Sequence, residues 1–304
     1  MIPIARTHLR TSLCLLASLI CFLLIACNKQ QPPIVDHPRL TSAVTMQDIT
    51  FFSPALQRQI PYRVVLPANY STTGRKLPVL YLLHGGGGGF RDWTNYSDVA
   101  QYAANGFILV MPEGNSSYYV NSATKPQDRY EDYIVKDLIS DVEQRFPAAP
   151  TRDERAIIGI SMGGFGAAVL ALKHPELFAF VGAMSPAIDV PSRPFSIKRI
   201  SQWRHHRSIF GPWNGQHQRD NDPYVLARSA DVAKTPYFFL SCGDTEGLLP
   251  ANKKFAALVR ERGFQYEFHV VPGGHDWNQW NAEFPEVYRV LYHHLGAAAH
   301  VRVR

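Results

Sequence analysis

The feature that most constrains the fold is a regular alternation of strand-like and helix-like segments over most of the chain. Residues 77–83 form a continuous apolar run, as expected for a strand that is covered on both faces. Similar strand-like runs occupy residues 107–111, 156–160, 178–184, 237–241 and 266–271. Helix-like segments lie between and after them, at residues 98–104, 130–145, 162–173, 251–262 and 277–295. This order predicts an α/β fold with a mostly parallel central sheet flanked by helices.

Two parts of the chain depart from this alternation. Residues 43–52 and 60–67 are β-rich and are joined by a proline-containing turn, which predicts an antiparallel start to the sheet. Residues 186–234 show no clean periodicity and contain five prolines. An insertion of this length in a compact domain is more often functional than idle, so we interpret it as a small cap beside the functional site. A segment that merely covers one edge of the sheet is the alternative.

The N-terminal segment has the pattern of an export signal. Arg6 and Arg10 precede an apolar run over residues 13–26, which is shorter than the ~20 residues of a permanent membrane helix. Its end resembles a bacterial lipobox, which implies cleavage before Cys27 and acylation of that cysteine. We therefore expect a lipoprotein signal peptide over residues 1–26 and a lipid-anchored protein in the bacterial cell envelope, facing the periplasm or the exterior. An ordinary signal peptide or a weak membrane anchor is the alternative.

The remaining boundaries and the composition limit what the rest of the chain can be. We expect a tether at residues 27–42, one α/β domain at 43–297 and a C-terminal tail at 298–304. The net charge of +6 is too small a surplus to indicate nucleic-acid binding. Once the signal is removed and Cys27 is acylated, Cys242 is the one cysteine left, so no internal disulfide is expected. The two adjacent histidine pairs, His205-His206 and His293-His294, lack metal-ligand spacing, and we expect neither a metal nor a cofactor.

The first motif with chemical meaning is the sequence Gly-Ile-Ser-Met-Gly at residues 159–163. It follows a strand-like run and precedes a helix-like run that begins with small residues. Gly-x-Ser-x-Gly in this setting is typical of a nucleophile elbow, where the chain turns sharply and exposes the serine. We therefore expect Ser161 to be a nucleophile and the N–H of Met162, at the start of the helix, to stabilise developing negative charge.

The second motif is His84 followed by five glycines. Consecutive glycines let backbone N–H groups approach a ligand without obstruction by a Cβ atom. A phosphate-binding loop is the competing interpretation, but no Gly-Lys-Ser/Thr follows, and Phe90 stands where a dinucleotide fingerprint has its third glycine. The run matches the oxyanion loop of ester hydrolases, so we expect the N–H of Gly86 to act together with that of Met162.

The third signal is a pair of glycine-containing loops that follow the last two predicted strands. One loop contains Asp244 and Glu246, and the other contains His275. Ligands of α/β folds bind beside the carboxyl ends of parallel strands, which is where both loops are expected to lie. The chain order of serine, acid and histidine is that of α/β-hydrolases. We therefore expect His275 to take the proton of Ser161 and the acid to orient the imidazole.

Together these motifs resemble the esterase-D-like branch of the α/β-hydrolases, over roughly residues 43–297. This branch includes S-formylglutathione hydrolases, feruloyl and acetyl-xylan esterases, tributyrin esterases and mycolyltransferases. The resemblance rests on His84-Gly-Gly, the serine motif, the Cys242-Gly243 loop and the Gly-His-Asp-Trp sequence at 274–277. It places the triad acid three residues after Gly243, which is Glu246. Because the family acid is usually an aspartate, Asp244 stays an alternative.

The resemblance implies a metal-free serine carboxylic-ester hydrolase, with an α/β-hydrolase fold, that forms an acyl-enzyme on a short-acyl or carbohydrate-linked ester. Thioester hydrolysis, acyl transfer to an alcohol, and a non-catalytic surface-binding lipoprotein on a hydrolase scaffold are the alternatives. Export argues against a cytosolic thioester, and the complete set of serine, acid and histidine argues against a silent scaffold. Lys198, Arg199, Arg204 and Arg207 in the insertion form either a solvated face or a contact for an acidic substrate.

Overall fold

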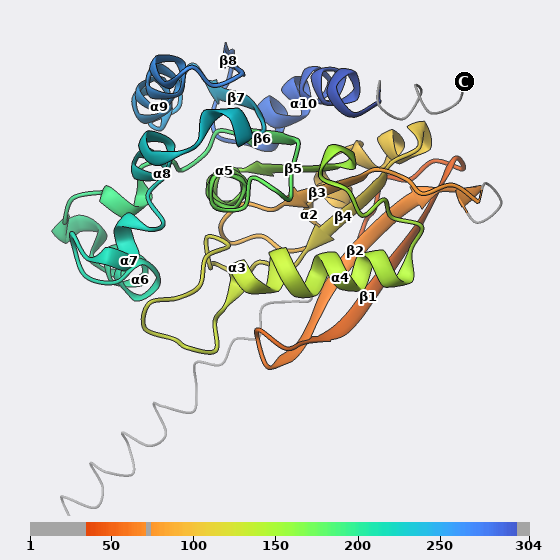
Figure 1. The fold of residues 1–304 in the computed structure, drawn as a ribbon, viewed down its shortest axis with the longest axis horizontal. Helices are drawn as coiled ribbons and strands as arrows, with labels where there is room; N and C mark the ends of the chain where they lie inside the picture. The colour runs from red at the N-terminus through yellow and green to blue at the C-terminus, as the bar shows by residue number, and fades with distance from the viewer. Residues whose placement is uncertain (1–34, 71–73, 297–304) are drawn as a thin grey trace, which may run out of the picture. The chain divides into compact units, whose positions relative to one another are not determined.

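The centre of the protein is an eight-stranded sheet with the spatial order β1-β2-β4-β3-β5-β6-β7-β8 (Figure 1). The computed structural model describes residues 35–70 and 74–296. The strands are β1 (Val44–Ser53), β2 (Arg58–Pro67), β3 (Val79–Leu83), β4 (Ile108–Pro112), β5 (Arg155–Ile160), β6 (Phe180–Met184), β7 (Tyr237–Gly243) and β8 (Tyr266–Val271). β2 is antiparallel to β1 and β4, and all other neighbours are parallel. The predicted α/β fold, including its antiparallel start, is confirmed.

Helices connect the strands. The α-helices are α2 (Asp92–Tyr96), α3 (Tyr130–Asp132), α4 (Ile139–Arg145), α5 (Met162–Lys173), α6 (Ile200–Phe210), α7 (Gln216–Arg219), α8 (Pro223–Ser229), α9 (Leu249–Arg262) and α10 (Trp277–Leu291). The 3₁₀ helices are η2 (Val99–Asn105), η4 (Arg152–Glu154), η5 (Val190–Ser192), η6 (Ile197–Arg199) and η7 (Val232–Lys234), and the π-helical segments are η3 (Tyr133–Leu138) and η8 (Tyr292–Gly296). A π-helical turn therefore interrupts the helix expected at 130–145, and the helix expected at 98–104 is 3₁₀.

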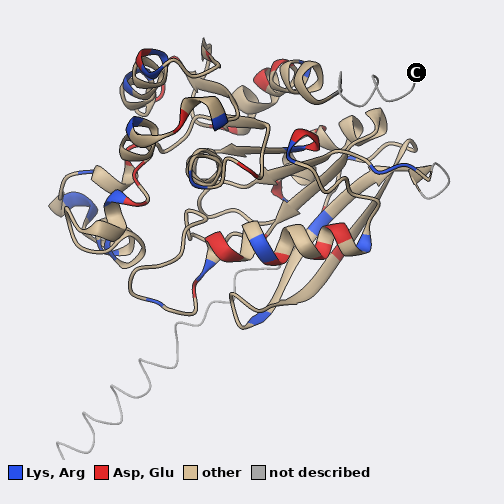
Figure 2. Ribbon diagram, viewed as in Figure 1, with Lys and Arg blue, Asp and Glu red and all other residues tan. Residues whose placement is uncertain are grey.

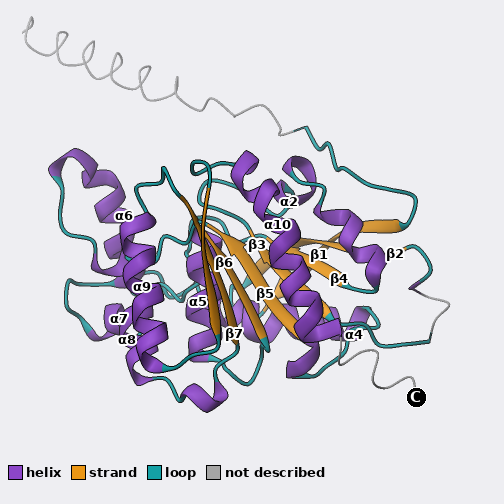
Figure 3. Cartoon of the chain, turned by 90° about the horizontal axis from the view of Figure 1, so that it is seen from above, coloured by secondary structure: helices purple, strands orange, loops and turns teal. Residues whose placement is uncertain are grey.

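Alternate residues of the inner strands pack on opposite faces of the sheet, as the two-residue period of a strand requires. In β3, Val79, Tyr81 and Leu83 join one apolar core with residues of α4, α5 and α9. Leu80 and Leu82 join a second core with residues of η2 and α10. Burial of each aliphatic side chain stabilises the fold by about 1.5–3 kcal/mol. Helices cover both faces of the sheet (Figure 3), which explains the unbroken apolar run in the sequence.

Between β6 and β7 the chain leaves the sheet and forms a series of short helices, from η5 to η7. A small separate core holds this segment against α5, with Val190, Ile209 and Phe210 packed on Phe165 and Val169. Within residues 186–234 the longest helix is α6, with 11 residues. Because prolines and glycines divide the segment into such short pieces, no long helical period is visible in the sequence.

Several predictions concern residues outside the described part of the chain. These are the signal peptide at 1–26, Cys27 with the first part of the tether, and the tail at 298–304. Over residues 35–70 and 74–296, no helix combines the length and the apolar content that a membrane span requires. The lipid anchor therefore stays a prediction.

Candidate active site

Ser161 stands at the turn from β5 into α5, with its backbone in a region that few non-glycine residues adopt. Its φ and ψ angles are 54° and −113°. A Cβ atom at Gly159 would lie 2.2 Å from the carbonyl carbon of Gly163, and one at Gly163 would lie 2.3 Å from the carbonyl oxygen of Leu83. Glycine at both positions therefore lets the two strands, the turn and the helix come close enough to form the elbow.

His275 connects Ser161 with Glu246. It lies in the loop between β8 and α10, where Asp276 caps the helix by accepting from the N–H of Asn278 at 2.9 Å. The Nε2 atom of His275 is 2.8 Å from the Oγ of Ser161, and its Nδ1 atom is 2.7 Å from Oε2 of Glu246. Because a carboxylate can only accept, we assign the proton to Nδ1, so that Nε2 accepts from the serine hydroxyl.

The side chain of Glu246 is completely buried. Its Oε1 atom accepts hydrogen bonds from the N–H of Gly243 at 2.8 Å and from the hydroxyl of Ser185 at 2.5 Å. Burial by itself would raise the pKa of the Glu246 carboxyl, but the hydrogen bonds from His275, Ser185 and Gly243 outweigh burial and hold the pKa below its ordinary value. The group is therefore ionised at neutral pH and can stabilise a charged imidazole.

Asp244, the alternative acid, has a different partner. Its Oδ1 atom accepts from the N–H of Gly273 at 3.0 Å, and the hydroxyl of Thr245 donates to the carbonyl of Gly273 at 2.8 Å. These two bonds tie the loop after β7 to the loop after β8. The structure therefore brings Glu246, rather than Asp244, into contact with His275.

Two residues that the sequence analysis did not identify complete the surroundings of Glu246. The hydroxyl of Ser185, directly after β6, accepts from Nε1–H of Trp280 at 3.0 Å while it donates to Glu246. The rings of Trp280 and His275 also pack edge to face, with their centroids 5.1 Å apart. A sequence signal existed for Ser185, because it is a polar residue at the carboxyl end of a buried parallel strand.

Gly86 and Met162, the two predicted oxyanion donors, lie next to each other beside Ser161. A Cβ atom at Gly86 would be 3.9 Å from the Cβ atom of Met162. Met162 is the first residue of α5, and the first N–H groups of a helix have no acceptor inside it. Both residues line the cleft that contains Ser161. The structure thus brings these two residues and the serine together.

His84 lies behind the glycine loop and is completely buried. Its Nδ1–H donates to the carbonyl of Gly85 at 2.8 Å, and its Nε2 accepts from the N–H of Gly114 at 2.8 Å. Glu113 supports the other end of the loop by accepting from the N–H of Phe90 at 3.3 Å. Because both ring nitrogens are engaged with the backbone, His84 supports the loop and has no nitrogen free for proton transfer.

The cleft that contains Ser161 has a volume of about 740 Å³ and is lined by two groups of residues. We call the first group the strand-end wall; it consists of Gly86, Ser161, Met162, Glu246 and His275. We call the second group the insertion wall; it consists of Ala187, Asp189, Arg193, Arg199, Gln202, His205 and His206. In the insertion wall, Arg193 pairs with Asp189 at 2.7 Å. Burial, together with the positive charges nearby, lowers the pKa of His206 to about 4, so this histidine is neutral at pH 7.

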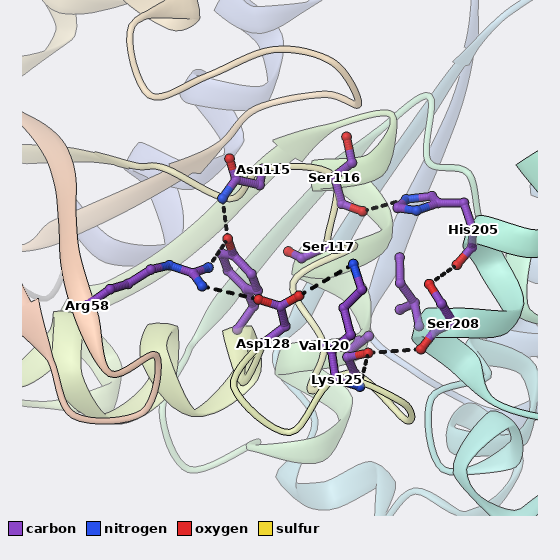
Figure 4. A pocket seen from close by; sticks show the side chains of 12 residues that line it. Arg58, Asn115, Ser116, Ser117, Val120, Lys125, Asp128, His205 and Ser208 are labelled. Atoms are coloured by element: carbon purple, nitrogen blue, oxygen red, sulfur yellow. Dashed lines mark hydrogen bonds and ion pairs between the residues drawn. The ribbon is translucent and has the colours of Figure 1, made fainter. Parts of the chain in front are cut away.

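A smaller cavity of about 170 Å³, lined mostly by polar residues (Figure 4), shares two lining residues with the cleft. Ser116 and His205 line both cavities, and Nε2 of His205 bonds the carbonyl oxygen of Ser116 at 2.9 Å. Elsewhere in the smaller cavity, Arg58 and Lys125 lie 3.2 and 3.9 Å from one carboxylate, that of Asp128. Two cations therefore share a single acid there.

Comparison with known proteins defines the family. The family model described as "Putative esterase" matches residues 53–291, so the chain belongs to this esterase family. An acetyl esterase of Caldicellulosiruptor saccharolyticus is 25% identical over 252 residues, which cover 78% of this chain and 94% of that protein. An esterase of Mycobacterium tuberculosis is 32% identical over 241 residues, or 70% of this chain, and the match spans 51% of that longer protein.

Solved structures agree with the sequence relatives. A ferulic acid esterase is 26% identical, with 81% of this chain and 98% of that chain covered, and superposes with a TM-score of 0.68. A fluorophosphonate-binding serine hydrolase of Staphylococcus aureus has the same fold, with a TM-score of 0.71, 24% identity and the same two coverages. The fold is that of the α/β-hydrolases, and the protein is a carboxylic ester hydrolase.

Proposed function

We propose that Ser161, His275 and Glu246 form the catalytic triad of a serine esterase. The observation that carries this proposal is the continuous line of hydrogen bonds, 2.8 and 2.7 Å long, through three side chains from three separate loops. Each loop follows a parallel strand of one sheet, where α/β folds place their ligands. The lowered pKa of Glu246 supports the assignment, because an ionised acid stabilises the imidazolium that forms during the reaction.

Acylation begins when His275 removes the proton of Ser161 and Oγ attacks the ester carbonyl carbon. The N–H groups of Gly86 and Met162 donate to the oxygen that becomes negative, and His275 then passes its proton to the departing alcohol. Water, activated by the same histidine, releases the acid. A positioned base contributes about 10²–10⁴-fold to the rate, and one oxyanion donor contributes about 3 kcal/mol.

The test is the hydrolysis of 4-nitrophenyl acetate and butyrate by the wild type and by Ser161→Ala. The variant is expected to lose about 10⁴-fold or more in kcat and to lose labelling by a fluorophosphonate probe. Ser116→Ala is the matched control, because it removes a hydroxyl from another residue that lines the cleft. Equal turnover by the wild type and Ser161→Ala would refute the proposal.

For the substrate we propose a short-acyl or carbohydrate-linked ester. Support comes from the names of two relatives, an acetyl esterase and a ferulic acid esterase. The competing activities are thioester hydrolysis and acyl transfer. A panel of acyl-chain and carbohydrate esters, ranked by kcat/KM, separates the candidates because that ratio reports differential binding of the transition state. Alcohol acceptors that outcompete water would favour acyl transfer, and preferred turnover of thioesters would favour the other activity.

We propose that residues 186–234 form a cap over the cleft, because they supply its insertion wall.

We also propose that Cys27 is acylated and anchors the protein in the cell envelope. The charged start, the apolar run and the lipobox-like end of the first 27 residues support the anchor. Incorporation of a labelled fatty acid in the wild type, and its loss in Cys27→Ser, is the expected result. Label that persists in the variant would exclude acylation at this residue.

A further inference from the structure

The insertion at residues 186–234 has a surplus of positive charge, with eight arginine and lysine residues against four aspartates. From residue 190 to residue 219 the chain contains six arginine and lysine residues and no aspartate or glutamate. Figure 2 shows the corresponding blue segments on the part of the ribbon that includes α6. Such a segment beside a cleft creates a positive potential inside it, because low-dielectric walls focus the field.

The four cations at residues 198–207 of this segment differ in their surroundings. Arg207 packs over the ring of Trp213, 5.6 Å from its centroid. Lys198 and Arg204 are exposed and lie outside the lining of the cleft. Arg199 belongs to the lining of the same cleft as the reactive serine. A solvated face therefore accounts for Lys198 and Arg204, but Arg199 faces the space that a substrate fills.

Among the residues that the structure describes, Arg199 has no acidic partner. Within residues 35–70 and 74–296, no carboxylate lies within ion-pair distance of its guanidinium group. The two acids that line the cleft already have partners. Asp189 pairs with Arg193 at 2.7 Å, and the buried Glu246 is hydrogen-bonded to His275 at 2.7 Å. An anion that enters the cleft therefore meets a guanidinium group whose charge is uncompensated.

The smaller cavity adds to this imbalance. Arg58 and Lys125 share the carboxylate of Asp128, and the cavity shares His205 and Ser116 with the cleft. Across both cavities, four arginine and lysine residues face two carboxylates, apart from the buried Glu246. This surplus of positive charge favours the binding of an anionic substrate, but not that of a neutral or cationic one.

We infer that the natural ester carries a carboxylate or phosphate group, and that Arg199 binds this group while the ester carbonyl lies at Ser161. The inference rests on the proposed esterase function and specifies its substrate class. A guanidinium presents a planar fork of donors that matches the oxygens of either anion. Arg199 is thus a specificity-determining residue that acts on substrate binding rather than on the chemical step.

The experiment compares matched pairs of esters that differ in one charge. For the acyl side, the pair is the half-ester of adipic acid with 4-nitrophenol and 4-nitrophenyl hexanoate. For the alcohol side, the pair is 4-acetoxybenzoate and 4-acetoxybenzamide. The two pairs show which half of the ester carries the anion. The proteins are the wild type, Arg199→Gln and Arg199→Lys, with Lys198→Gln as a control that removes the neighbouring charge outside the cleft.

In at least one pair, the wild type is expected to prefer the anionic ester. Arg199→Gln should then lower kcat/KM for the anionic ester about tenfold more than for its neutral partner, mainly through KM. Arg199→Lys should retain part of this preference, and Lys198→Gln should retain all of it. Because the pairing is accessible to solvent, the preference should shrink as ionic strength rises.

Two results would overturn the inference: a wild type that prefers the neutral ester in both pairs, or an Arg199→Gln variant that slows both members of a pair equally. Calorimetric binding of the same esters to Ser161→Ala measures the charge preference without turnover. If the wild type hydrolyses no ester but the anionic esters still bind more tightly, the proposed function fails and the anion site stands. If hydrolysis depends on Ser161 but shows no charge preference, the proposed function stands and the anion site fails.

Discussion

The two walls of the cleft are built in different ways. In the strand-end wall, Glu246 is completely buried and accepts three hydrogen bonds, and Ser161 is held by a backbone turn that glycine alone permits. In the insertion wall, Arg199 and His205 are exposed, and they project from short helices that rest on a small core. Buried, fully bonded polar groups therefore fix the reacting geometry, whereas exposed side chains carry the charge that meets the substrate.

The largest expected effect separates the two acids of the strand-end side. Glu246→Gln keeps the size of the side chain but removes the charge that orients and stabilises His275, so kcat should fall about 10³–10⁴-fold. Asp244→Asn should reduce kcat less than about tenfold, because Asp244 bonds a loop N–H instead of the histidine. Steady-state hydrolysis of 4-nitrophenyl butyrate measures both variants. A larger loss in Asp244→Asn would reverse the assignment of the acid.

The next effect tests the elbow through stability. A Cβ atom at position 163 would meet the carbonyl oxygens of Leu83 and His84 at 2.3 and 2.7 Å, and neither backbone can move without disturbing β3. Gly163→Ala should therefore lower the free energy of unfolding by about 3 kcal/mol or more. Gly247→Ala is the control, since a Cβ atom there meets nothing within 4 Å. Urea denaturation compares the two, and similar stabilities would show that the elbow tolerates a side chain.

The same contrast explains what the sequence could and could not predict. The strands were recognisable because a strand buried on both faces reads as an unbroken apolar run, and the elbow because its close contacts demand glycine at 159 and 163. The role of Ser185 could not be predicted because it depends on Glu246 and Trp280, which are 61 and 95 residues away along the chain. The insertion resisted prediction because its helices are too short to show a period and are held by contacts with α5.

A pH effect of intermediate size tests the insertion wall. His206 is 4% exposed, and burial, followed by the charges of Arg193, His205 and Arg207, lowers its pKa to about 4. In the unfolded chain a histidine has a pKa near 6.5, so the unfolded state binds the proton first as the pH falls. The free energy of unfolding should therefore decrease between pH 6.5 and pH 4, by on the order of 2–3 kcal/mol.

This pH dependence should weaken in His206→Gln and largely persist in His205→Gln, because the buried His206 remains in that variant. Denaturation by urea at pH 7, 5.5 and 4 gives the required free energies. Equal slopes for the wild type and His206→Gln would show that this histidine is not the group responsible. In the strand-end wall, the carboxylate of Glu246 should affect the free energy of unfolding in a lower pH range. Its depressed pKa gives stability that is lost only as the pH falls below about 4.3.

The smallest effect concerns Ser185, a positioning residue behind the acid. Ser185→Ala removes one of three donors to Glu246 and leaves the indole N–H of Trp280 without its acceptor, so kcat should fall about tenfold with little change in KM. Trp280→Phe removes the indole donor but keeps an aromatic ring beside His275, and it should lower kcat less. The decisive measurement is Ser185→Ala in a Glu246→Gln background, where the serine no longer has a carboxylate to hold. Because Ser185 acts through Glu246, its effect should largely vanish there. A tenfold loss in both backgrounds would mean that Ser185 supports the site by another route.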